Sequence, residues 1–330
     1  MADPGTRRVL VDAGSAGSRL DLFLVEHLSD SDLRLSRSEI QRLITEGQIS
    51  LNGAKTKASA RIKLNDEIVL RLLPVRIPTV SSEDLPLEIL YEDMDLIVIN
   101  KPAGLTVHPA AGNWTGTLVN ALLFHCPDIS AIGGERRPGI VHRLDKDTSG
   151  VIVAVKNMDA YHDLMLQFKN RTVEKEYLGL AWGRVMPEKG SIDRPIGRHR
   201  SDRKKMSSLH FSGIARKALT EWRVDRRFVL PNSQRALTLL RLRPHTGRTH
   251  QLRVHLADSG YPLVGDRLYG KKRGGGATRE FPDSLSASFP RQALHAQTLV
   301  LNHVRSGERM RFTAPLPEDF LNLLRQLRAV

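Results

Sequence analysis

The 330-residue sequence has a single cysteine, Cys126, and only 5% aromatic residues. One cysteine excludes an intramolecular disulfide framework and a cysteine-based zinc cluster, which makes a reducing cytoplasm the expected compartment. Few aromatic residues argue against a protein that binds single strands mainly by repeated base stacking. The sequence also lacks a long apolar run, a signal-peptide core and a basic amphipathic helix with an aromatic face, so no membrane association is expected.

Acidic residues are scarce relative to basic ones. Lys and Arg number 50 against 36 Asp and Glu, which gives a formal net charge of +14. A charge of this sign and size indicates a polyanionic partner. Because a membrane surface is disfavoured, nucleic acid is the predicted partner, recognised mainly through charge and shape.

The length allows two domains, and the first part of the chain reads as a small one. Residues 1–17 are polar and Gly-rich without a sustained period, which predicts a flexible lead-in. Helical spacing follows in 18–28 and 36–46, with Ser18 and Ser36 placed as N-caps and Gly47 as a C-cap.

Short strands are expected next, around an Asn-Gly turn at positions 52 and 53. Residues 18–76 should therefore form a compact module. A Pro- and Ser-bearing linker is expected over 77–86, and a larger domain over 87–330.

Strand-like segments dominate the larger domain. Helical segments interrupt them without regular alternation, which predicts an α+β fold with a large mixed, mainly antiparallel sheet flanked by helices. The expected strands are 87–102, 104–110, 174–185, 218–228 and 235–244; the expected helices are 117–125, 158–170 after an Asn157 cap, and part of 249–260.

The stretch "IVHRLDKDTSG" (140–150) places Arg143 and Asp145 in a polar loop, expected at the tip of a hairpin between two apolar runs. Residues two apart on a strand face the same side, so the guanidinium could lie near the carboxylate and keep it ionised and nucleophilic. A hairpin loop with ordinary surface charges explains the same residues, and Asp147 suits a turn.

A second chemistry-bearing stretch is "RPHTGRTHQLRVH" (243–255), where Arg248 lies at the start of a helix. His250 and His255 are five residues apart, whereas neighbours on a helix face are three or four apart, so a metal site is disfavoured. Phosphate binding by the arginines and the helix N-terminus fits better. Tyr177, in the strand "EKEYLGL" (174–180), reads from the sequence alone as a core or interface tyrosine.

Two basic groups are candidates for RNA contact. The segment 194–208 carries six Arg or Lys against one Asp, and is either a solvated loop or one that closes on phosphates. In the small module, acidic residues nearly balance basic ones, but the basic ones cluster and permit a basic face. The candidates are Arg198, Lys204 and Lys205 in the loop, and Arg37, Arg42, Lys55, Lys57 and Arg61 in the module.

Together, "HRLDKDTSG", "EKEYLGL", "PIGRH", "TGRTHQLRVHLADSGYPLVGDRLYG" and "RQALHA" resemble, in this order, the RluA-type pseudouridine synthases, most of all the RluD group that modifies large-subunit ribosomal RNA. Residues 18–76 resemble the small S-four-type RNA-binding module that commonly precedes the catalytic domain in that group. The resemblance spans nearly the whole chain after the lead-in. It implies an isomerase that uses no metal and no organic cofactor.

The resemblance also assigns roles. Asp145 would be the catalytic aspartate, Arg143 would displace the target nucleotide, and Tyr177 would pack against the flipped base, with proton transfer at carbon 5 as a further role open to it. Arg248 would pair with Asp145, and Leu252 would line the uracil pocket. His142 and Thr249 are implied to contact the substrate.

The reaction detaches uracil from ribose, turns it and rejoins carbon 5 to the sugar. Asp145 could attack the sugar or remove a neighbouring proton to give a glycal; either route needs an ionised carboxylate in a dry pocket. The uridine must leave its stack to reach such a pocket.

Three alternatives stay open from the sequence. The chain could be a non-catalytic RNA-binding or ribosome-assembly factor, or a metal-dependent nuclease that uses Asp145 and Asp147. It could also carry out the same chemistry on transfer RNA. The target uridines, the choice between free RNA and an assembling large subunit, and the oligomeric state are not readable, with a monomer as the default.

Overall fold

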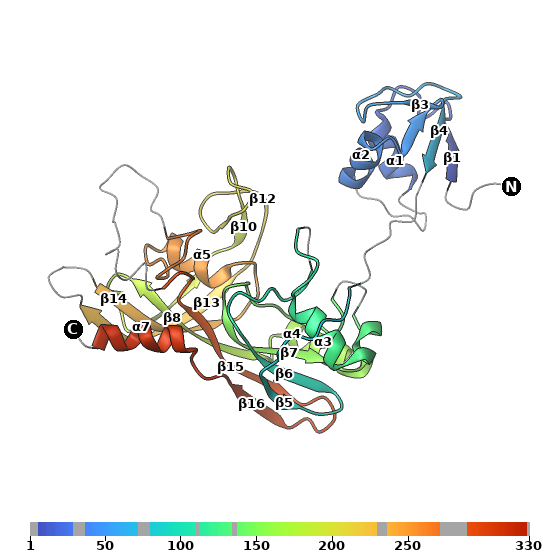
Figure 1. Cartoon of the computed structure of the whole chain (residues 1–330). Coiled ribbons are helices and arrows are strands. Elements are labelled where there is room, and N and C mark those ends of the chain that lie inside the picture. Colours follow the sequence, from blue (N-terminus) through green and yellow to red (C-terminus); the bar gives the residue numbers. More distant parts are fainter. Residues whose placement is uncertain are drawn as a thin grey trace. The chain divides into compact units, whose positions relative to one another are not determined.

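The computed structural model describes residues 6–28, 37–71, 80–109, 112–133, 137–229, 236–270 and 289–328 (Figure 1). The chain divides into two compact units, Met1–Pro78 and Thr79–Val330. The division falls within the stretch expected as a linker, 77–86. The far end of that stretch packs on the second unit, because the Asn120 side-chain amide donates to the Ser81 carbonyl (2.7 Å) and the Glu83 amide donates to the Asn120 carbonyl (3.0 Å).

The first unit has two helices and a four-stranded antiparallel sheet in the order β1-β4-β2-β3. Its core is made by apolar residues from both helices and the sheet, among them Leu20, Leu24, Ile40, Ile49 and Leu70. The elements are β1 (Thr6–Leu10), α1 (Leu20–His27), α2 (Arg37–Thr45), β2 (Ile49–Leu51), β3 (Ala54–Lys55) and β4 (Glu67–Arg71).

The two predicted helices and the hairpin turn of this unit are confirmed. Asn52 and Gly53 have φ values of 51° and 76°, as a type I′ turn requires. Gly47, at φ 75°, lies just after the end of α2. Helix α1 starts at Leu20, and its N-cap is Arg19 rather than Ser18. The expected cap at Ser36 lies outside the described residues.

The expectation of a flexible lead-in over 1–17 is wrong for residues 6–17. Thr6–Leu10 forms β1, which pairs with β4 from Thr6 opposite Arg71 to Leu10 opposite Glu67. Val9 and Val11 are buried in the core of the unit. Two apolar residues beside exposed arginines give no clear period, and the segment is stabilised by contacts with parts of the chain some 60 residues away, which a local pattern does not show.

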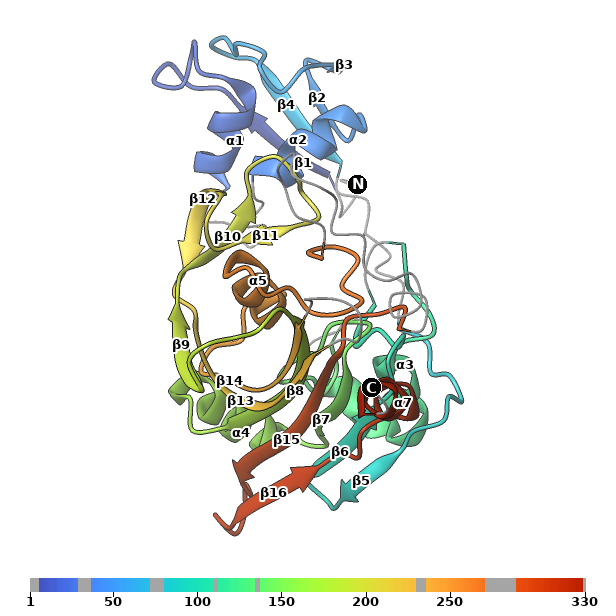
Figure 2. The ribbon, with the colours of Figure 1, turned by 90° about the vertical axis from the view of Figure 1, so that its left-hand side faces the viewer.

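The second unit is built on a nine-stranded sheet in the order β5-β6-β7-β15-β8-β14-β13-β9, with β16 also paired to β15 (Figure 2). Only β7 and β15 run parallel; the other pairs are antiparallel, which confirms the mixed, mainly antiparallel sheet. Its strands are β5 (Ile89–Glu92), β6 (Leu96–Lys101), β7 (Ser149–Val155), β8 (Glu174–Trp182), β9 (Lys189–Asp193), β13 (Leu219–Val229), β14 (Ala236–Pro244), β15 (Leu294–Asn302) and β16 (Arg309–Thr313).

Helices cover this sheet in three places. Leu122 of α3 (Leu118–His125) and Leu164 of α4 (Met158–Asn170) pack with residues of β6 and β7. Helix α5 (Gln251–Asp258) packs through Leu252 and Leu256 on β8 and β14, and α7 (Glu318–Arg328) packs beside β8 through Phe320. A 3-10 turn, η1 (Pro127–Ala131), follows α3, and a second small sheet joins β11 (Met206–Ser207), β10 (Ile196–His199) and β12 (Phe211–Arg216).

Two local expectations in this unit are wrong. Of the stretch expected as a strand over 104–110, the described residues 104–109 do not form one; their one pairing in the described part of the chain is a single bridge between Thr106 and Thr117. The stretch 140–148 is a loop that enters β7 directly, with one isolated bridge between Ile140 and Ala154, and not a regular hairpin. Side chains from distant parts of the chain donate hydrogen bonds to the carbonyls of this loop, as described below.

None of the helices in the described ranges combines the length and the apolar character that crossing a membrane would demand.

Candidate active site

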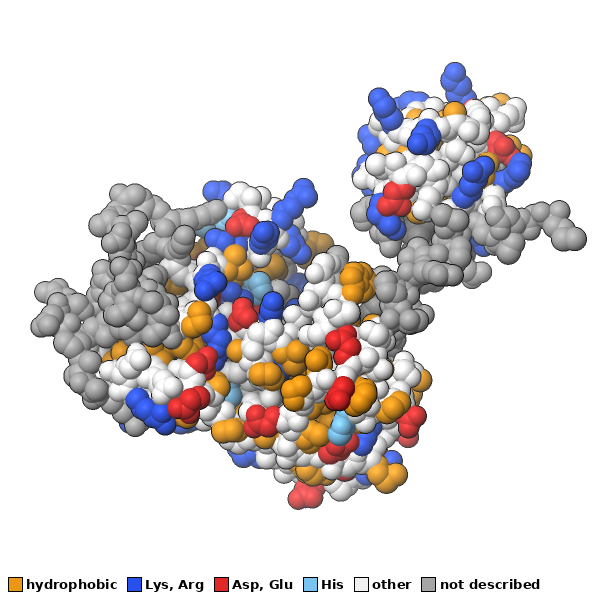
Figure 3. Space-filling model, in the orientation of Figure 1, with side chains coloured by type: hydrophobic (Ala, Val, Ile, Leu, Met, Phe, Trp, Pro, Cys, Tyr) orange, Lys and Arg blue, Asp and Glu red, His pale blue; other side chains and the backbone are white. Residues whose placement is uncertain are grey.

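A cavity of about 450 Å³ opens in the second unit. Its walls come from the loop before β7, from the end of α4 with the start of β8, and from the turn before α5 with the first residues of that helix. Residues 141–145, 168–177 and 244–253 supply most of the lining. On the face drawn in Figure 3, Lys and Arg side chains gather over β10 and β12 and just below these strands.

The loop that carries Asp145 is fixed by side chains from distant parts of the chain. The fully buried Lys101 ammonium donates to the carbonyls of Lys146 (3.0 Å), Pro102 (2.7 Å) and Leu105 (2.9 Å). Arg291 donates to the next carbonyl, that of Asp147 (3.1 Å). Burial lowers the pKa of Lys101 to about 7. The two backbone carbonyls that follow Asp145 are therefore both held by buried cations.

Asp145 is paired with Arg253. The Arg253 Nη1 lies 3.0 Å from Asp145 Oδ2, and its Nε and Nη2 donate to the buried Asp266 at 2.7 and 3.0 Å. The guanidinium also lies 5.2 Å from the ring centre of Tyr269. Burial lowers the pKa of Arg253, but the hydrogen bonds and charges of Asp266 and Asp145 outweigh it and raise the pKa overall. The arginine is thus a fixed cation that aims one N–H at the Asp145 carboxylate.

The expected pairing of Arg248 with Asp145 is wrong. Arg248 lines the cavity, but its Nε donates to the carbonyl of Lys217 at 3.1 Å. The reason is the start of α5: His250 has a left-handed φ of 57°, and the helix begins at Gln251. Arg248 consequently lies in the turn before the helix, whereas Arg253 lies on its first turn. The sequence reasoning missed Arg253, although its partner Asp266 stands in the quoted stretch "GDRLYG".

Three of the expected substrate residues line the same cavity as Asp145. Arg143 and Thr249 are exposed there, and Leu252 is buried. Tyr177 of β8 also lines it. Burial raises the pKa of the Tyr177 phenol, and the Asp145 charge adds to this effect, so the hydroxyl stays protonated at neutral pH. The structure therefore brings an acidic, an aromatic and a cationic side chain to one pocket.

His142 lines the cavity too, but its ring is held by contacts with neighbouring residues. Its Nε2 accepts a hydrogen bond from the Val153 amide (3.0 Å), and the ring stacks on Phe168 with centres 4.9 Å apart. Burial lowers the pKa of His142 to about 3, so the imidazole is neutral. Val153 and Phe168 fix its orientation.

The basic candidates outside the cavity differ in how freely they are held. Arg198 donates to the Arg203 carbonyl (2.6 Å), the Lys205 ammonium lies 3.8 Å from Asp202, and Lys204 is exposed. In the first unit, Arg37 forms an ion pair with the buried Asp21 (2.9 Å), and Arg42 forms one with Glu46 (3.3 Å). Arg61 donates a hydrogen bond to the Gly17 carbonyl (2.7 Å). The side chains of Lys55 and Lys57 are exposed. Several Lys and Arg side chains show on the drawn face of this unit (Figure 3).

His250 and His255, considered above as metal ligands, form hydrogen bonds with other groups. His250 Nδ1 lies 2.8 Å from the Tyr269 hydroxyl. Both nitrogens of His255 are engaged, Nδ1 by the Thr220 hydroxyl (2.9 Å) and Nε2 by the Arg194 carbonyl (3.0 Å). Their hydrogen bonds hold α5 in place.

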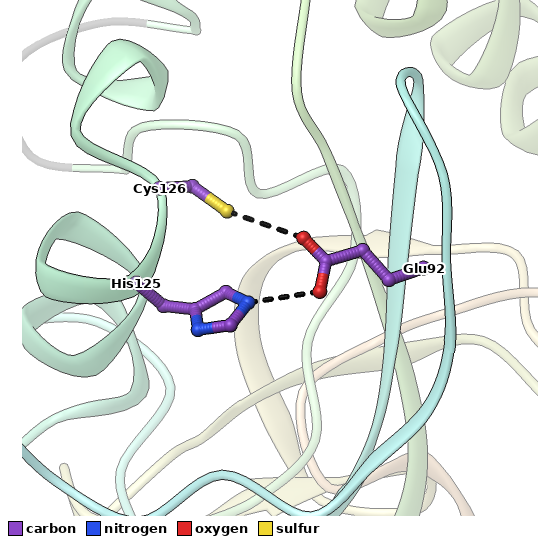
Figure 4. A group of neighbouring side chains, drawn as sticks. All are labelled: Glu92, His125 and Cys126. Carbon is purple, nitrogen blue, oxygen red and sulfur yellow. Dashed lines mark hydrogen bonds and ion pairs between the residues drawn. The ribbon is translucent and has the colours of Figure 1, made fainter.

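A group of metal-capable side chains lies outside the cavity lining, at the ends of β5 and α3 (Figure 4). The Glu92 carboxylate accepts from the Cys126 thiol (3.7 Å) and lies 2.8 Å from His125 Nε2. The Lys156 ammonium also lies 2.8 Å from this carboxylate. Because Lys156 already balances the Glu92 charge, we interpret the cluster as an ion-pair network that ties β5 to α3. Asp93, Asp95 and His303 form a similar group, with Arg305 bound to Asp95 (2.5 Å).

Comparison with known proteins gives consistent matches. The family described as RNA pseudouridylate synthase matches residues 95–258, and the S4 domain matches residues 18–68. The chain is 44% identical over 320 residues to an uncharacterized RNA pseudouridine synthase of Synechocystis sp., covering 96% of this chain and 91% of that protein. It is 41% identical over 329 residues to the ribosomal large subunit pseudouridine synthase D of Pseudomonas aeruginosa, covering 99% and 98%.

Among solved structures, the human RNA pseudouridylate synthase domain containing 4 superposes with a TM-score of 0.54 at 31% identity, covering 73% of this chain and 93% of that one.

Proposed function

Because the chain belongs to the RNA pseudouridine synthase family, whose members isomerise uridine to pseudouridine in RNA, we propose that it acts on large-subunit ribosomal RNA with Asp145 as the catalytic carboxylate. The observation that carries this assignment of Asp145 is its place in the cavity. The carboxylate shares the cavity with Tyr177 and accepts a hydrogen bond from the fixed cation Arg253.

The reaction breaks the bond between N1 of uracil and C1′ of ribose, turns the base and forms the bond from C5 to C1′. C5 then loses its proton and N1 takes one up, so that no atom is gained or lost. Attack on the sugar by Asp145 and removal of a ribose proton by Asp145 both start from the ionised carboxylate. Arg253 keeps a positive charge beside it, and a base that enters the cavity would displace water from the half-buried carboxylate. Tyr177 gives the turned base an aromatic surface, and Leu252 gives it an apolar one.

Base flipping supplies the substrate to this cavity. A uridine stacked in a helix cannot reach a carboxylate inside the protein, so the nucleotide must turn out of the strand. Arg143 is exposed at the cavity, in the loop that holds Asp145. We assign to it the displacement of the target nucleotide and the occupation of the gap that remains. Thr249 is assigned a contact with the RNA strand that enters the cavity, and the fixed ring of His142 is assigned a structural role in the cavity wall.

The RNA partner supports further assignments. The S4 domain, with Arg37, Arg42, Lys55, Lys57 and Arg61, is proposed to hold RNA beside the target, and Arg198, Lys204 and Lys205 are proposed to contact its phosphates. The name of the Pseudomonas aeruginosa relative supports large-subunit ribosomal RNA as the substrate, and we propose the cytoplasm as the location of the protein. We propose that a monomer acts on this RNA or on an assembling large subunit.

The substrate proposal is tested with purified protein in a chelating buffer. Unmodified large-subunit RNA, small-subunit RNA and transfer RNA are incubated separately, and pseudouridines are mapped by carbodiimide labelling and primer extension. New sites in the large-subunit RNA alone are expected. Sites confined to transfer RNA would overturn the choice of substrate, and a requirement for added magnesium would overturn the chemistry proposed for Asp145.

A further inference from the structure

Lys175 is half-buried, and among the described residues its ammonium has neither a carboxylate partner nor a hydrogen-bond acceptor, unlike the buried cations around the cavity. Arg253 is paired with Asp145 and Asp266, Arg291 with Asp319, and Lys101 donates to three carbonyls. The Lys175 Nζ lies 5.9 Å from the ring centre of Phe168. Burial alone lowers the pKa of Lys175, to about 8.

The strand β8 explains this isolation. Glu174 and Glu176 flank Lys175, but they lie on the opposite face of the strand, where Glu176 pairs with Arg241 (2.8 Å) and Glu174 with Arg243 (2.9 Å) and Arg309. Lys175 and Tyr177 share the other face, and both line the cavity. The two faces of β8 therefore differ in charge. Glu174 and Glu176 are neutralised by arginines on the face away from the cavity, and the Lys175 ammonium lies on the face that lines it.

The other charged residues of the cavity lining add to this excess of positive charge. Asp145 is its one carboxylate among the described residues, and Arg253 already holds it. Lys169 and Arg171, after the end of α4, and Arg248, before α5, add positive charge to the lining. A half-buried ammonium without an anion is partly desolvated without a compensating charge, and such groups gather at functional sites. The missing partner is an anion that arrives with the substrate.

We propose that Lys175 binds a backbone phosphate of the RNA at the flipped uridine, and so anchors the nucleotide whose base packs against Tyr177. Residues two apart on a strand are separated by roughly 7 Å, and a lysine is a flexible point charge on a four-carbon chain. A base at Tyr177 thus brings its own or the adjoining phosphate within reach of the ammonium. This inference rests on the proposed function, because it takes the flipped uridine as the ligand.

Two variants separate the charge of Lys175 from its packing. Lys175→Met keeps an apolar chain on the Phe168 ring and removes the charge, whereas Lys175→Arg keeps the charge. Lys189→Met, at an exposed lysine of β9 outside the cavity lining, is the matched control. Thermal unfolding of each purified variant establishes that it is folded.

Affinity for a short fluorescein-labelled RNA is measured by anisotropy at several salt concentrations, and turnover is measured on the RNA that the wild type modifies. Lys175→Met is expected to weaken binding and raise KM roughly tenfold, and to reduce the salt slope of log K by about 0.7–0.9, with kcat little changed. Lys175→Arg is expected to restore most of the salt slope, and Lys189→Met to match the wild type.

A fall in kcat with unchanged affinity and salt slope would overturn the proposal, since Lys175 would then act in the chemistry and not on a phosphate. Equal behaviour of Lys175→Met and Lys189→Met would overturn it as well. Because binding is measured apart from turnover, a wild type that binds RNA but modifies none would refute the proposed function while the salt slopes still decide the role of Lys175.

Discussion

Replacing Arg253 by lysine tests whether this arginine, and not Arg248, serves the Asp145 carboxylate. Arginine donates one hydrogen bond to Asp145 (3.0 Å) and two to Asp266 (2.7 and 3.0 Å), whereas a single ammonium cannot span both carboxylates. Asp266 keeps two backbone donors, the amides of Leu268 and Tyr269, each at 3.0 Å. The carboxylate most affected by the lost hydrogen bond is therefore that of Asp145. A hydrogen bond between charged groups contributes about 1.5–3 kcal/mol, which corresponds to a roughly 10- to 150-fold lower rate.

The assay is single-turnover pseudouridine formation at saturating RNA, which separates the chemical step from binding. Arg248→Lys is the matched control, because Arg248 lines the same cavity but donates to the Lys217 carbonyl. Its rate at saturation should change less than about fivefold, with the main effect on RNA affinity. A normal rate for Arg253→Lys together with a large loss for Arg248→Lys would refute the geometry described for Asp145.

Three further changes test other parts of the structure. Lys101→Met removes the donor of three carbonyl hydrogen bonds and should destabilise the chain by about 2–4 kcal/mol in urea unfolding, whereas Lys189→Met should not. Gly150→Ala, at φ 114°, would push its Cβ into the Ala296 carbonyl where β7 pairs with β15, and should cost about 2–4 kcal/mol in the same assay. RNA affinity of the wild type should fall as pH rises from 7 to 9, because burial lowers the pKa of Lys175 to about 8 and its ammonium becomes neutral in this range. Lys101, with a pKa of about 7, also titrates at the lower end, whereas His142, with a pKa of about 3, does not. Lys175→Met should therefore show a smaller fall, and the difference from the wild type measures the share of Lys175.

Local patterns predicted most of the elements. The Asn157 cap and the Asn-Gly turn are carried by neighbouring residues, and the structure shows both. Strand β1 could not be predicted in the same way. Its stability comes from pairing with β4, so nothing within Thr6–Leu10 identifies it as a strand.

The active-site loop shows the same limit. Motifs identified Asp145 as the candidate, but the shape of its loop depends on Lys101, 45 residues before Lys146, and on Arg291, 144 residues after Asp147. The choice between Arg248 and Arg253 depends on the left-handed residue His250, which sets where α5 begins. A shift of that start changes which side chain faces the carboxylate, and spacing in the sequence does not determine it.

The most direct test of the account is an Asp145→Asn variant, compared with Asp147→Asn on an RNA that the wild type modifies. Both changes remove one negative charge at nearly constant size, but only Asp145 lines the cavity and pairs with Arg253. We expect Asp145→Asn to bind the RNA as the wild type does and to form no pseudouridine in a single turnover, while Asp147→Asn stays active. Pseudouridine formation by Asp145→Asn at the wild-type rate would contradict the central claim that Asp145 performs the chemistry.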